Sequence, residues 1–356
     1  MSRFLDKRYI GLEPYVPGEQ PRDRSYVKLN TNESPFKPSP KVVEAISDLE
    51  VGKLNLYSDP TAKDLIRAIA ENYKVDESNV TVSNGSDEVL AFAFCAFCGK
   101  DKPMVCPEVS YGFYPVFCEL FSVPYVTVPM RNDLSVDVEG FYGTKGNITI
   151  ANPNAQTGTF ISVDEIEKLV KSRSDDVVII DEAYVDFGGE SCAPLIAKYN
   201  NLLVVQTFSK SRSLAGGRVG FAIGNSELIR DIERMKYSFN PYNLNRLSIL
   251  AGTAAMRDKA YFENCVAAIK SIRSKTVEEL KKLGMKVLPS RANFVLAALD
   301  GIGGEELYKA LKDKGVLVRF LTDKMLSPYI RITIGSQEMM NTLISSIKEI
   351  KKERNL

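Results

Sequence analysis

The stretch that decides the fold is LLVVQTFSKSRSLAGGRVGFAIG, from Leu202 to Gly224. It opens on a continuous apolar run, which is typical of a strand buried on both faces of a sheet. Lys210 follows soon after that run, and Arg218 comes eight residues later, beside a pair of glycines. A second apolar run closes the stretch. Because lysine usually lies on a solvated surface, a lysine at the end of a buried strand indicates a functional site.

Five more apolar runs precede this stretch from residue 79 onward, separated by helical or turn segments. They read NVTVS, KPMVCP, PYVTVP, NITIAN and DVVIID. Runs of this kind that alternate with helices form parallel sheets covered on both faces. The sequence therefore predicts a doubly wound α/β domain with a mostly parallel, seven-stranded sheet.

The regions around this pattern predict two further parts of the chain. Residues 1–38 are rich in proline and turn residues, so we expect an extended N-terminal arm. Residues 39–250 form the predicted large domain. Beyond them helical periodicity dominates, interrupted by strand-like MKVLPSRANFVLAAL, VLVRFL and YIRITIG. Residues 251–356 are therefore predicted to form a smaller α+β domain.

Charge and composition narrow the range of partners. The 356 residues include 46 basic and 45 acidic side chains, for a net charge of +1. This balance gives no electrostatic reason to expect nucleic acid or a membrane surface as a partner. The start of the chain is too charged for a signal peptide, and the apolar runs are shorter than the roughly 18 residues of a membrane span. We therefore expect a cytoplasmic protein.

The chain contains no histidine. This excludes a Ser-His-Asp triad, a Cys-His pair, an HExxH zinc site and any histidine general base. Cys95 and Cys98 form a CxxC, but no second ligand pair accompanies it, so no metal site is expected. Acid–base chemistry near neutral pH must come from lysine, tyrosine, carboxylates, cysteine or a cofactor.

Residues that follow the strands carry the functional prediction, because sites in open α/β sheets lie outside the carboxyl ends of the strands. After NVTVS, Ser86 and Asp87 begin a helix whose free N–H groups suit a phosphate. A simple helix cap is the alternative. After DVVII comes Asp181, a carboxylate that is either structural or holds a cationic nitrogen of a ligand.

The third strand end carries Lys210. Desolvation and a nearby cation lower the pKa of such a lysine and free its amine as nucleophile and base. Arg218 suits a phosphate, because a guanidinium group binds it through two hydrogen bonds. A phosphate cradle, a carboxylate for a pyridinium nitrogen and a lysine for a Schiff base match the protein side of a pyridoxal 5'-phosphate site.

The motifs around these residues resemble those of the fold-type I, aspartate-aminotransferase-like enzymes, which use pyridoxal phosphate. The resemblance rests on LNTNESPFKPSP, SNGSDE, PEVSYGFY, IIDEAYVDF, TFSKSRSLAGGRVGF and YIRITIG. Within that family the chain is similar to histidinol-phosphate aminotransferases over nearly its whole length. The resemblance implies a homodimer with shared active sites, a small-molecule amino donor and a 2-oxo acid.

The resemblance also implies roles for single residues. Lys210 forms the Schiff base and shuttles the proton, Asp181 pairs with the ring nitrogen, and Tyr184 binds the phenolic oxygen of the cofactor. Tyr111 stacks on the ring, and Tyr57 reaches the cofactor of the neighbouring subunit.

Two groups of residues bind anions by the same resemblance. The cofactor phosphate is held by Ser86, Asp87, Thr207, Ser209 and Arg218. The substrate is bound by Tyr15, Arg319 and Arg331.

One segment departs from the family pattern. The family often reads NNPTG where this chain has PNAQTG, so Ala155 stands where an asparagine contacts the cofactor. Asn154 or Asn152 takes over through a shifted turn, or Tyr184 acts alone. The alternative for Asn154 is a turn-stabilising role of its side chain.

The leading prediction is histidinol-phosphate:2-oxoglutarate transamination, in histidine biosynthesis. Aromatic aminotransferases and a threonine-phosphate decarboxylase share nearly all of these motifs and remain alternatives. A non-enzymatic protein that has kept the fold is a third hypothesis, against which the intact set of cofactor-binding residues argues.

Overall fold

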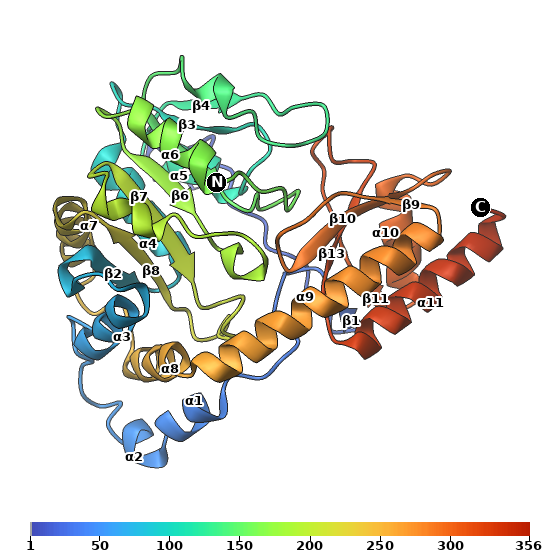
Figure 1. The fold of residues 1–356 in the computed structure, drawn as a ribbon, viewed down its shortest axis with the longest axis horizontal. Coiled ribbons are helices and arrows are strands. Elements are labelled where there is room, and N and C mark those ends of the chain that lie inside the picture. Colours follow the sequence, from blue (N-terminus) through green and yellow to red (C-terminus); the bar gives the residue numbers. More distant parts are fainter. Residues whose placement is uncertain (1) are drawn as a thin grey trace.

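The computed structural model describes residues 2–356, and within them the largest sheet has seven strands (Figure 1). The strand order is β2-β8-β7-β6-β5-β3-β4. Neighbours from β7 to β4 pair in parallel, whereas β8 is antiparallel to both β2 and β7. The strands are β2 (Val80–Ser83), β3 (Met104–Pro107), β4 (Tyr125–Val128), β5 (Asn147–Ala151), β6 (Val178–Asp181), β7 (Leu202–Thr207) and β8 (Gly220–Gly224). They coincide with the seven apolar runs, so the predicted mostly parallel α/β sheet is confirmed.

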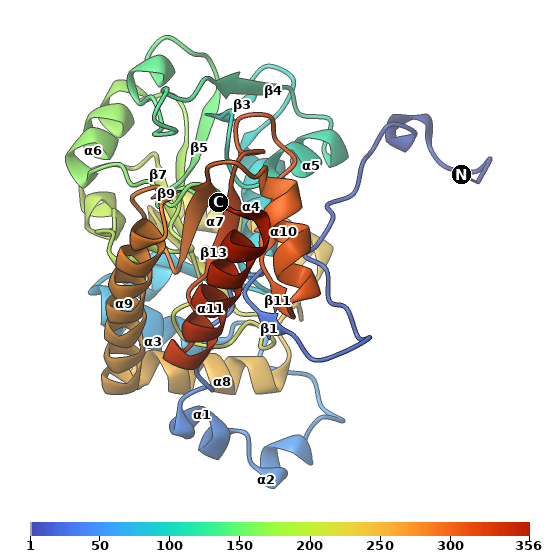
Figure 2. The same ribbon diagram turned by 90° about the vertical axis from the view of Figure 1, so that its right-hand side faces the viewer.

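Helices cover both faces of this sheet, because successive strand side chains point to opposite sides (Figures 1 and 2). On one face, Ile179 and Leu203 pack with α4 (Ser86–Phe97), α5 (Phe113–Leu120) and α7 (Ser226–Phe239). On the other, Ile180 and Val204 pack with α3 (Lys63–Tyr73), α6 (Val163–Ser172) and α8 (Arg246–Arg257). Burial on both sides explains why the strand sequences lack polar alternation.

The C-terminal part of the chain builds a smaller lobe. Its antiparallel sheet has the order β12-β13-β10-β9. The strands are β9 (Met285–Val287), β10 (Phe294–Leu299), β12 (Arg319–Phe320) and β13 (Ile330–Thr333). Helices α10 (Gly304–Asp313) and α11 (Gln337–Arg354) share an apolar cluster with it, as does part of α9 (Lys259–Lys282). Helix α9 runs from α8 to this lobe and connects the two parts (Figure 1).

The N-terminal arm is more structured than the sequence predicted. Strand β1 (Val27–Lys28) pairs in parallel with β11 (Val316–Leu317), and Leu29 donates its N–H to the Leu317 carbonyl at 2.7 Å. The arm is therefore bonded into the small lobe instead of being merely extended. A two-residue strand shows no alternation that a sequence pattern could reveal. The predicted domain limits at residues 38 and 250 stay predictions.

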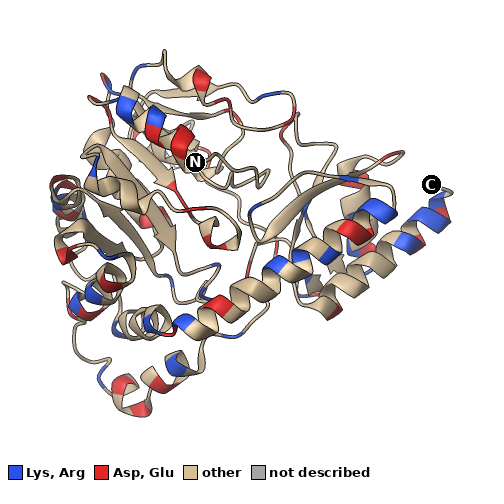
Figure 3. Cartoon of the chain, viewed as in Figure 1, with Lys and Arg blue, Asp and Glu red and all other residues tan. Residues whose placement is uncertain are grey.

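Short elements complete the chain. Helices α1 (Pro40–Ala45) and α2 (Asp48–Val51) follow the arm, and the 3-10 helices are η1 (Lys7–Tyr9), η2 (Glu77–Asn79), η3 (Glu139–Phe141), η4 (Val185–Phe187) and η5 (Ala193–Ala197). Basic and acidic residues both occur along the long helices α9 and α11 (Figure 3). Among residues 2–356, no helix is both long and apolar enough to cross a membrane.

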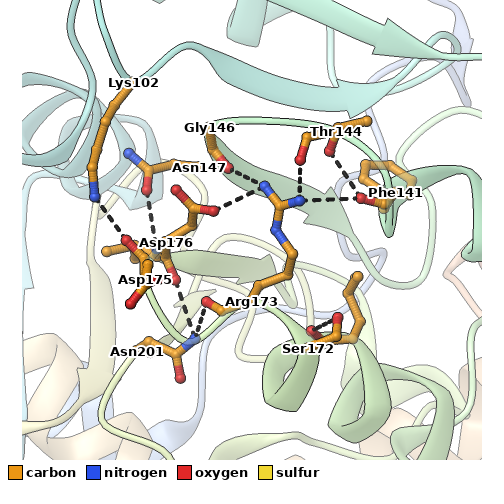
Figure 4. Close-up of polar contacts among 12 residues, drawn as sticks. Lys102, Phe141, Thr144, Gly146, Asn147, Ser172, Arg173, Asp175, Asp176 and Asn201 are labelled. Atoms are coloured by element: carbon orange, nitrogen blue, oxygen red, sulfur yellow. Dashed lines mark hydrogen bonds and ion pairs between the residues drawn. The ribbon is translucent and has the colours of Figure 1, made fainter.

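Arg173, just after α6, is a buried arginine that binds the segments preceding two central strands (Figure 4). Its guanidinium group donates to the carbonyl of Thr144 and, at 2.8 Å, to that of Gly146. It also forms an ion pair with Asp176 at 2.9 Å. Because Gly146 precedes β5 and Asp176 precedes β6, one side chain fixes both strand starts.

We expect Arg173→Met to lower the free energy of unfolding by about 3 kcal/mol, because it leaves a carboxylate and buried carbonyls without their donor. Arg67→Met is the control, since Arg67 pairs with Glu77 on the surface. The control should lose less than about 1 kcal/mol. Urea unfolding measures both values, and equal losses would contradict a structural role for Arg173.

Candidate active site

A cavity of about 880 Å³ opens at the carboxyl ends of the large sheet's parallel strands. Its lining combines residues of the large sheet, the N-terminal arm and the small lobe. The predicted site residues found there are Tyr15, Ser86, Asp87, Tyr111, Asp181, Tyr184, Thr207, Ser209, Lys210, Arg218, Arg319 and Arg331. Residues far apart in the sequence thus meet in one place, as expected for an α/β sheet.

Lys210 lies three residues beyond the end of β7. The hydroxyl oxygen of Thr207 accepts the N–H of Ser209 at 3.1 Å, which ends the strand in a tight turn. The Lys210 amine donates to the Thr31 carbonyl at 3.3 Å and lies 5.8 Å from the ring centre of Tyr184. The amine therefore lies at the cavity and is bonded to a backbone carbonyl and not to a carboxylate.

Asp181 is the last residue of β6, and its side chain is buried. Its oxygens accept the Tyr114 hydroxyl at 2.8 Å and the Ala183 N–H at 3.2 Å. Both donors are neutral, and burial raises the pKa of Asp181 to about 6. Burying a carboxylate without a bonded cation is costly, so the position suits a cationic nitrogen of a ligand.

Two glycines let the N-terminus of α4 and Arg218 come close together. Gly85 has a φ of +86°, and a Cβ there would lie 2.4 Å from Nη2 of Arg218. A Cβ on Gly220 would lie 2.2 Å from the backbone nitrogen of Ser86. Among the described residues, no side chain caps the start of α4. Its first N–H groups and a guanidinium thus converge, which is the arrangement that an anion requires.

The carboxylate of Asp87 joins the two sides of this cradle. One oxygen accepts from Nη2 of Arg218 at 3.2 Å, and the other accepts the Tyr111 hydroxyl at 2.9 Å. Arg218 holds a φ of +48°, which is uncommon for a residue with a side chain. The sequence predicted a contribution from the Asp87 N–H, whereas the structure adds a carboxylate that orients Arg218 and Tyr111.

Arg331 and Arg319 bring two more positive charges to the cavity. Arg331 donates to the Ala155 carbonyl and to the side-chain oxygen of Gln156, both at 2.9 Å. Burial lowers the pKa of Arg331, and its Nε is buried without a hydrogen-bond partner in residues 2–356. Arg319 donates to the Val16 carbonyl at 3.3 Å. Because these acceptors are neutral, both guanidinium charges remain open to an anionic ligand.

Two predicted residues lie outside this lining. Tyr57 is 78% exposed and stacks on Tyr242, with ring centres 4.4 Å apart. Asn154 is buried, and its side-chain oxygen accepts the N–H groups of Gln156 and Thr157 at 2.9 and 3.0 Å. Its amide donates to a backbone carbonyl at 2.8 Å. The structure thus favours the turn-stabilising interpretation of Asn154 over a cofactor contact.

Comparison with known proteins shows the family to which this cavity belongs. Residues 24–347 match the family described as "Aminotransferase class I and II". The chain belongs to this family. It is 47% identical to the histidinol-phosphate aminotransferase of Brachyspira hyodysenteriae, over 99% of this chain and 100% of that protein.

Two solved structures share the fold. Histidinol-phosphate aminotransferase from Sinorhizobium meliloti, in complex with pyridoxal 5'-phosphate, matches with a TM-score of 0.85 and 23% identity, covering 93% of this chain and 92% of that one. A mutant of Thermus thermophilus aspartate aminotransferase matches with a TM-score of 0.84 and 21% identity, covering 98% and 100%. The predicted fold class and the predicted pyridoxal-phosphate-dependent aminotransferase are confirmed.

The cavity of this aminotransferase fits its cofactor on two counts. The cradle at Gly85 and Gly220 offers N–H groups and a guanidinium, which suit a phosphate. Asp181, whose pKa is raised by burial, suits a protonated ring nitrogen. A family whose chemistry depends on a cofactor also needs no histidine, which the chain lacks.

Sequence reasoning missed three side chains of the site. Tyr114 donates to Asp181, Gln156 accepts from Arg331, and Asn32 donates to Tyr184 at 3.0 Å. Each lies within a motif that was recognised, but the motifs did not say which side chains meet. The burial of Asn32, which shows that its side chain requires a partner, is visible only in the structure.

We expect Asp181→Asn to stabilise the cofactor-free protein at pH 8 by about 1–3 kcal/mol. The folded-state pKa of Asp181 is raised, so its protonation contributes stability at low pH that is lost as the pH rises through about 6. Asparagine carries no charge to desolvate, so the advantage should vanish near pH 4. Urea unfolding at both pH values checks this, and a variant less stable than wild type at pH 8 would contradict it.

Proposed function

We propose that this aminotransferase transfers an amino group between histidinol phosphate and 2-oxoglutarate, in the cytoplasm and as a homodimer. The observation that carries the choice of substrate is the 47% identity to a histidinol-phosphate aminotransferase over the full length of both chains. The cavity agrees with it, because the amino donor and the 2-oxo acid both present an anion, and two guanidinium groups face the cavity.

The cofactor, when bound, supplies an aldehyde for the amino group and an aromatic ring that withdraws electrons from the reacting carbon. Lys210 anchors this group through its amine and carries the proton to and from the substrate. Its position beyond β7 and its neutral hydrogen bond support that role. Asp181 would hold the positive charge of the ring nitrogen, because its carboxylate is buried and its hydrogen bonds come from the neutral Tyr114 hydroxyl and Ala183 N–H.

The remaining residues bind and orient. Tyr184 would donate to the phenolic oxygen of the cofactor, and Tyr111, whose hydroxyl is bonded to Asp87, would hold its ring. The phosphate would be held by residues that line the cavity at the cradle, which are Ser86, Asp87, Thr207, Ser209 and Arg218. Arg331 binds the carboxylate of the 2-oxo acid or the phosphate of the amino donor, with Arg319 and Tyr15 as its neighbours in the cavity.

A half-reaction screen tests the substrate. Histidinol phosphate and glutamate should change the visible spectrum of the holoenzyme, and Arg331→Gln should lower both rates roughly 100-fold, because a charge-assisted bidentate contact is lost. Arg230→Gln, on the exposed face of α7, is the matched control and should react as wild type.

Other results of the same screen would overturn the substrate assignment. Preferred reaction with phenylalanine or tyrosine would indicate an aromatic aminotransferase. Release of CO2 from phosphothreonine without turnover of an oxo acid would indicate a decarboxylase. Failure to take up pyridoxal phosphate would refute an enzyme of this class altogether.

The homodimer is supported by exposed apolar side chains on and after α2 and at the C-terminal end of α7. Leu49, Leu56, Tyr57 and Phe239 are each more than half exposed there. Large exposed apolar side chains mark interaction surfaces. Tyr57 is one of these side chains and lies outside its own subunit's cavity lining, which agrees with a contact across the dimer.

A mixing experiment tests the shared site. Lys210→Ala should be inactive alone, and Tyr57→Ala should be strongly impaired. After unfolding and refolding together, hybrid dimers contain one site with both native residues, so about a quarter of the wild-type activity should return. Mixtures that stay as inactive as the separate variants would show that Tyr57 does not serve the partner's site.

A further inference from the structure

The N-terminal arm places the buried side-chain amide of Asn32 in contact with a residue of the site. Asn32 follows β1, is 2% exposed and holds a φ of +55°. Its Nδ2 donates to the hydroxyl oxygen of Tyr184 at 3.0 Å. Tyr184 comes from the segment after β6 and lines the cavity, so this bond joins the arm to the large sheet at the site itself.

Three further hydrogen bonds fix Asn32 in place. The backbone N–H of Asn32 donates to the hydroxyl oxygen of Thr333 at 3.0 Å. The same hydroxyl donates its proton to Oδ1 of Asn32 at 3.1 Å. Asn293 donates to the Asn32 carbonyl at 3.0 Å. A hydroxyl group can accept one hydrogen bond and donate another, so Thr333 can accept from the backbone of Asn32 and donate to its side-chain oxygen. The oxygen of the Asn32 amide therefore faces Thr333, and its NH2 group faces Tyr184.

This arrangement decides the direction of the Tyr184 proton. A phenol oxygen that accepts the Asn32 N–H has its own proton free to point elsewhere, and Tyr184 borders the cavity. Ala155 also lines that wall and has no side-chain donor to add. The hydroxyl of Tyr184 is therefore the donor that this part of the wall can offer to a ligand oxygen.

We propose that Asn32 is a positioning residue that acts through Tyr184, turning the phenol into a hydrogen-bond donor toward the phenolic oxygen of the cofactor. This inference rests on the role of Tyr184 in the proposed function. A donated bond stabilises the negative charge on the acceptor oxygen and so lowers the pH at which the bound cofactor changes its protonation state. The bond from Asn32 strengthens that effect, because linked hydrogen bonds polarise one another.

The test is a pH titration of the visible absorbance of the holoenzyme in four proteins: wild type, Asn32→Ala, Tyr184→Phe and the double variant. Each single variant should move the midpoint upward, by roughly 0.5–1 pH unit for Asn32→Ala. In the Tyr184→Phe background, Asn32→Ala should cause no further shift. Additive shifts, or an unchanged midpoint in Asn32→Ala, would overturn the proposal.

Two more variants separate orientation from loss of structure. Asn32→Asp keeps the shape and the acceptor for Thr333 but removes the donor, so the phenol must donate to it and the midpoint should rise at least as far as in Asn32→Ala. Asn147→Ala removes a buried amide that bonds to the Phe97 carbonyl far from the cavity. It should lower stability without moving the midpoint, and an equal shift in this control would refute a specific role for Asn32.

A second measurement does not depend on the cofactor or on the substrate. Urea unfolding of the same four proteins without cofactor gives the coupling between Asn32 and Tyr184. The losses in the free energy of unfolding of the two single variants should add up to more than the loss in the double variant. Additive losses would show that Asn32 and Tyr184 do not interact and would overturn the proposal. Coupled losses in a protein that fails to transaminate would refute the proposed function but not the hydrogen bond.

Discussion

The site depends on charges that the protein buries without neutralising them. Asp181 accepts hydrogen bonds from the neutral Tyr114 hydroxyl and Ala183 N–H, and Arg331 donates to neutral oxygens. Each charge costs stability in the cofactor-free protein, because desolvation is not offset by an ion pair. A ligand with a cationic ring and anionic arms supplies the missing opposite charges. The cavity is thus preorganised for a pyridoxal cofactor and an anionic substrate.

Three separate parts of the chain hold these charges in position. The large sheet presents Asp181 and Lys210 at neighbouring strand ends, and the small lobe presents Arg331 from β13. The arm lies between them, where Thr31 accepts from Lys210 and Asn32 bonds to both Tyr184 and Thr333. Rigid strands set the directions of the charged groups, and the arm fills the space that the two lobes leave.

Much of this arrangement could be predicted from sequence. The seven buried strands appear as apolar runs, and parallel topology brings the residues after them to one edge, which is why Lys210 and Asp181 could be recognised. The two-residue strand β1 left no pattern to read. The bonds of Asn32 to Tyr184 and of Gln156 to Arg331 join residues 152 and 175 positions apart, and no local rule identifies such partners. The turn-stabilising bonds of Asn154, in contrast, are local: its side-chain oxygen accepts N–H groups two and three residues further along the chain, and an alternative of this kind could be predicted from sequence.

The pairing of the arm with the small lobe sets an order on assembly. Asn32 bonds to Thr333, 301 residues further along, and β1 is completed by β11. During synthesis the large sheet can form long before residue 333 leaves the ribosome, because its strands are local by comparison. The wall around Lys210 is therefore closed last. A chain that ended before β11 and β13 would lack the partners of β1 and Asn32, and Lys210 would then lie in a more open cavity.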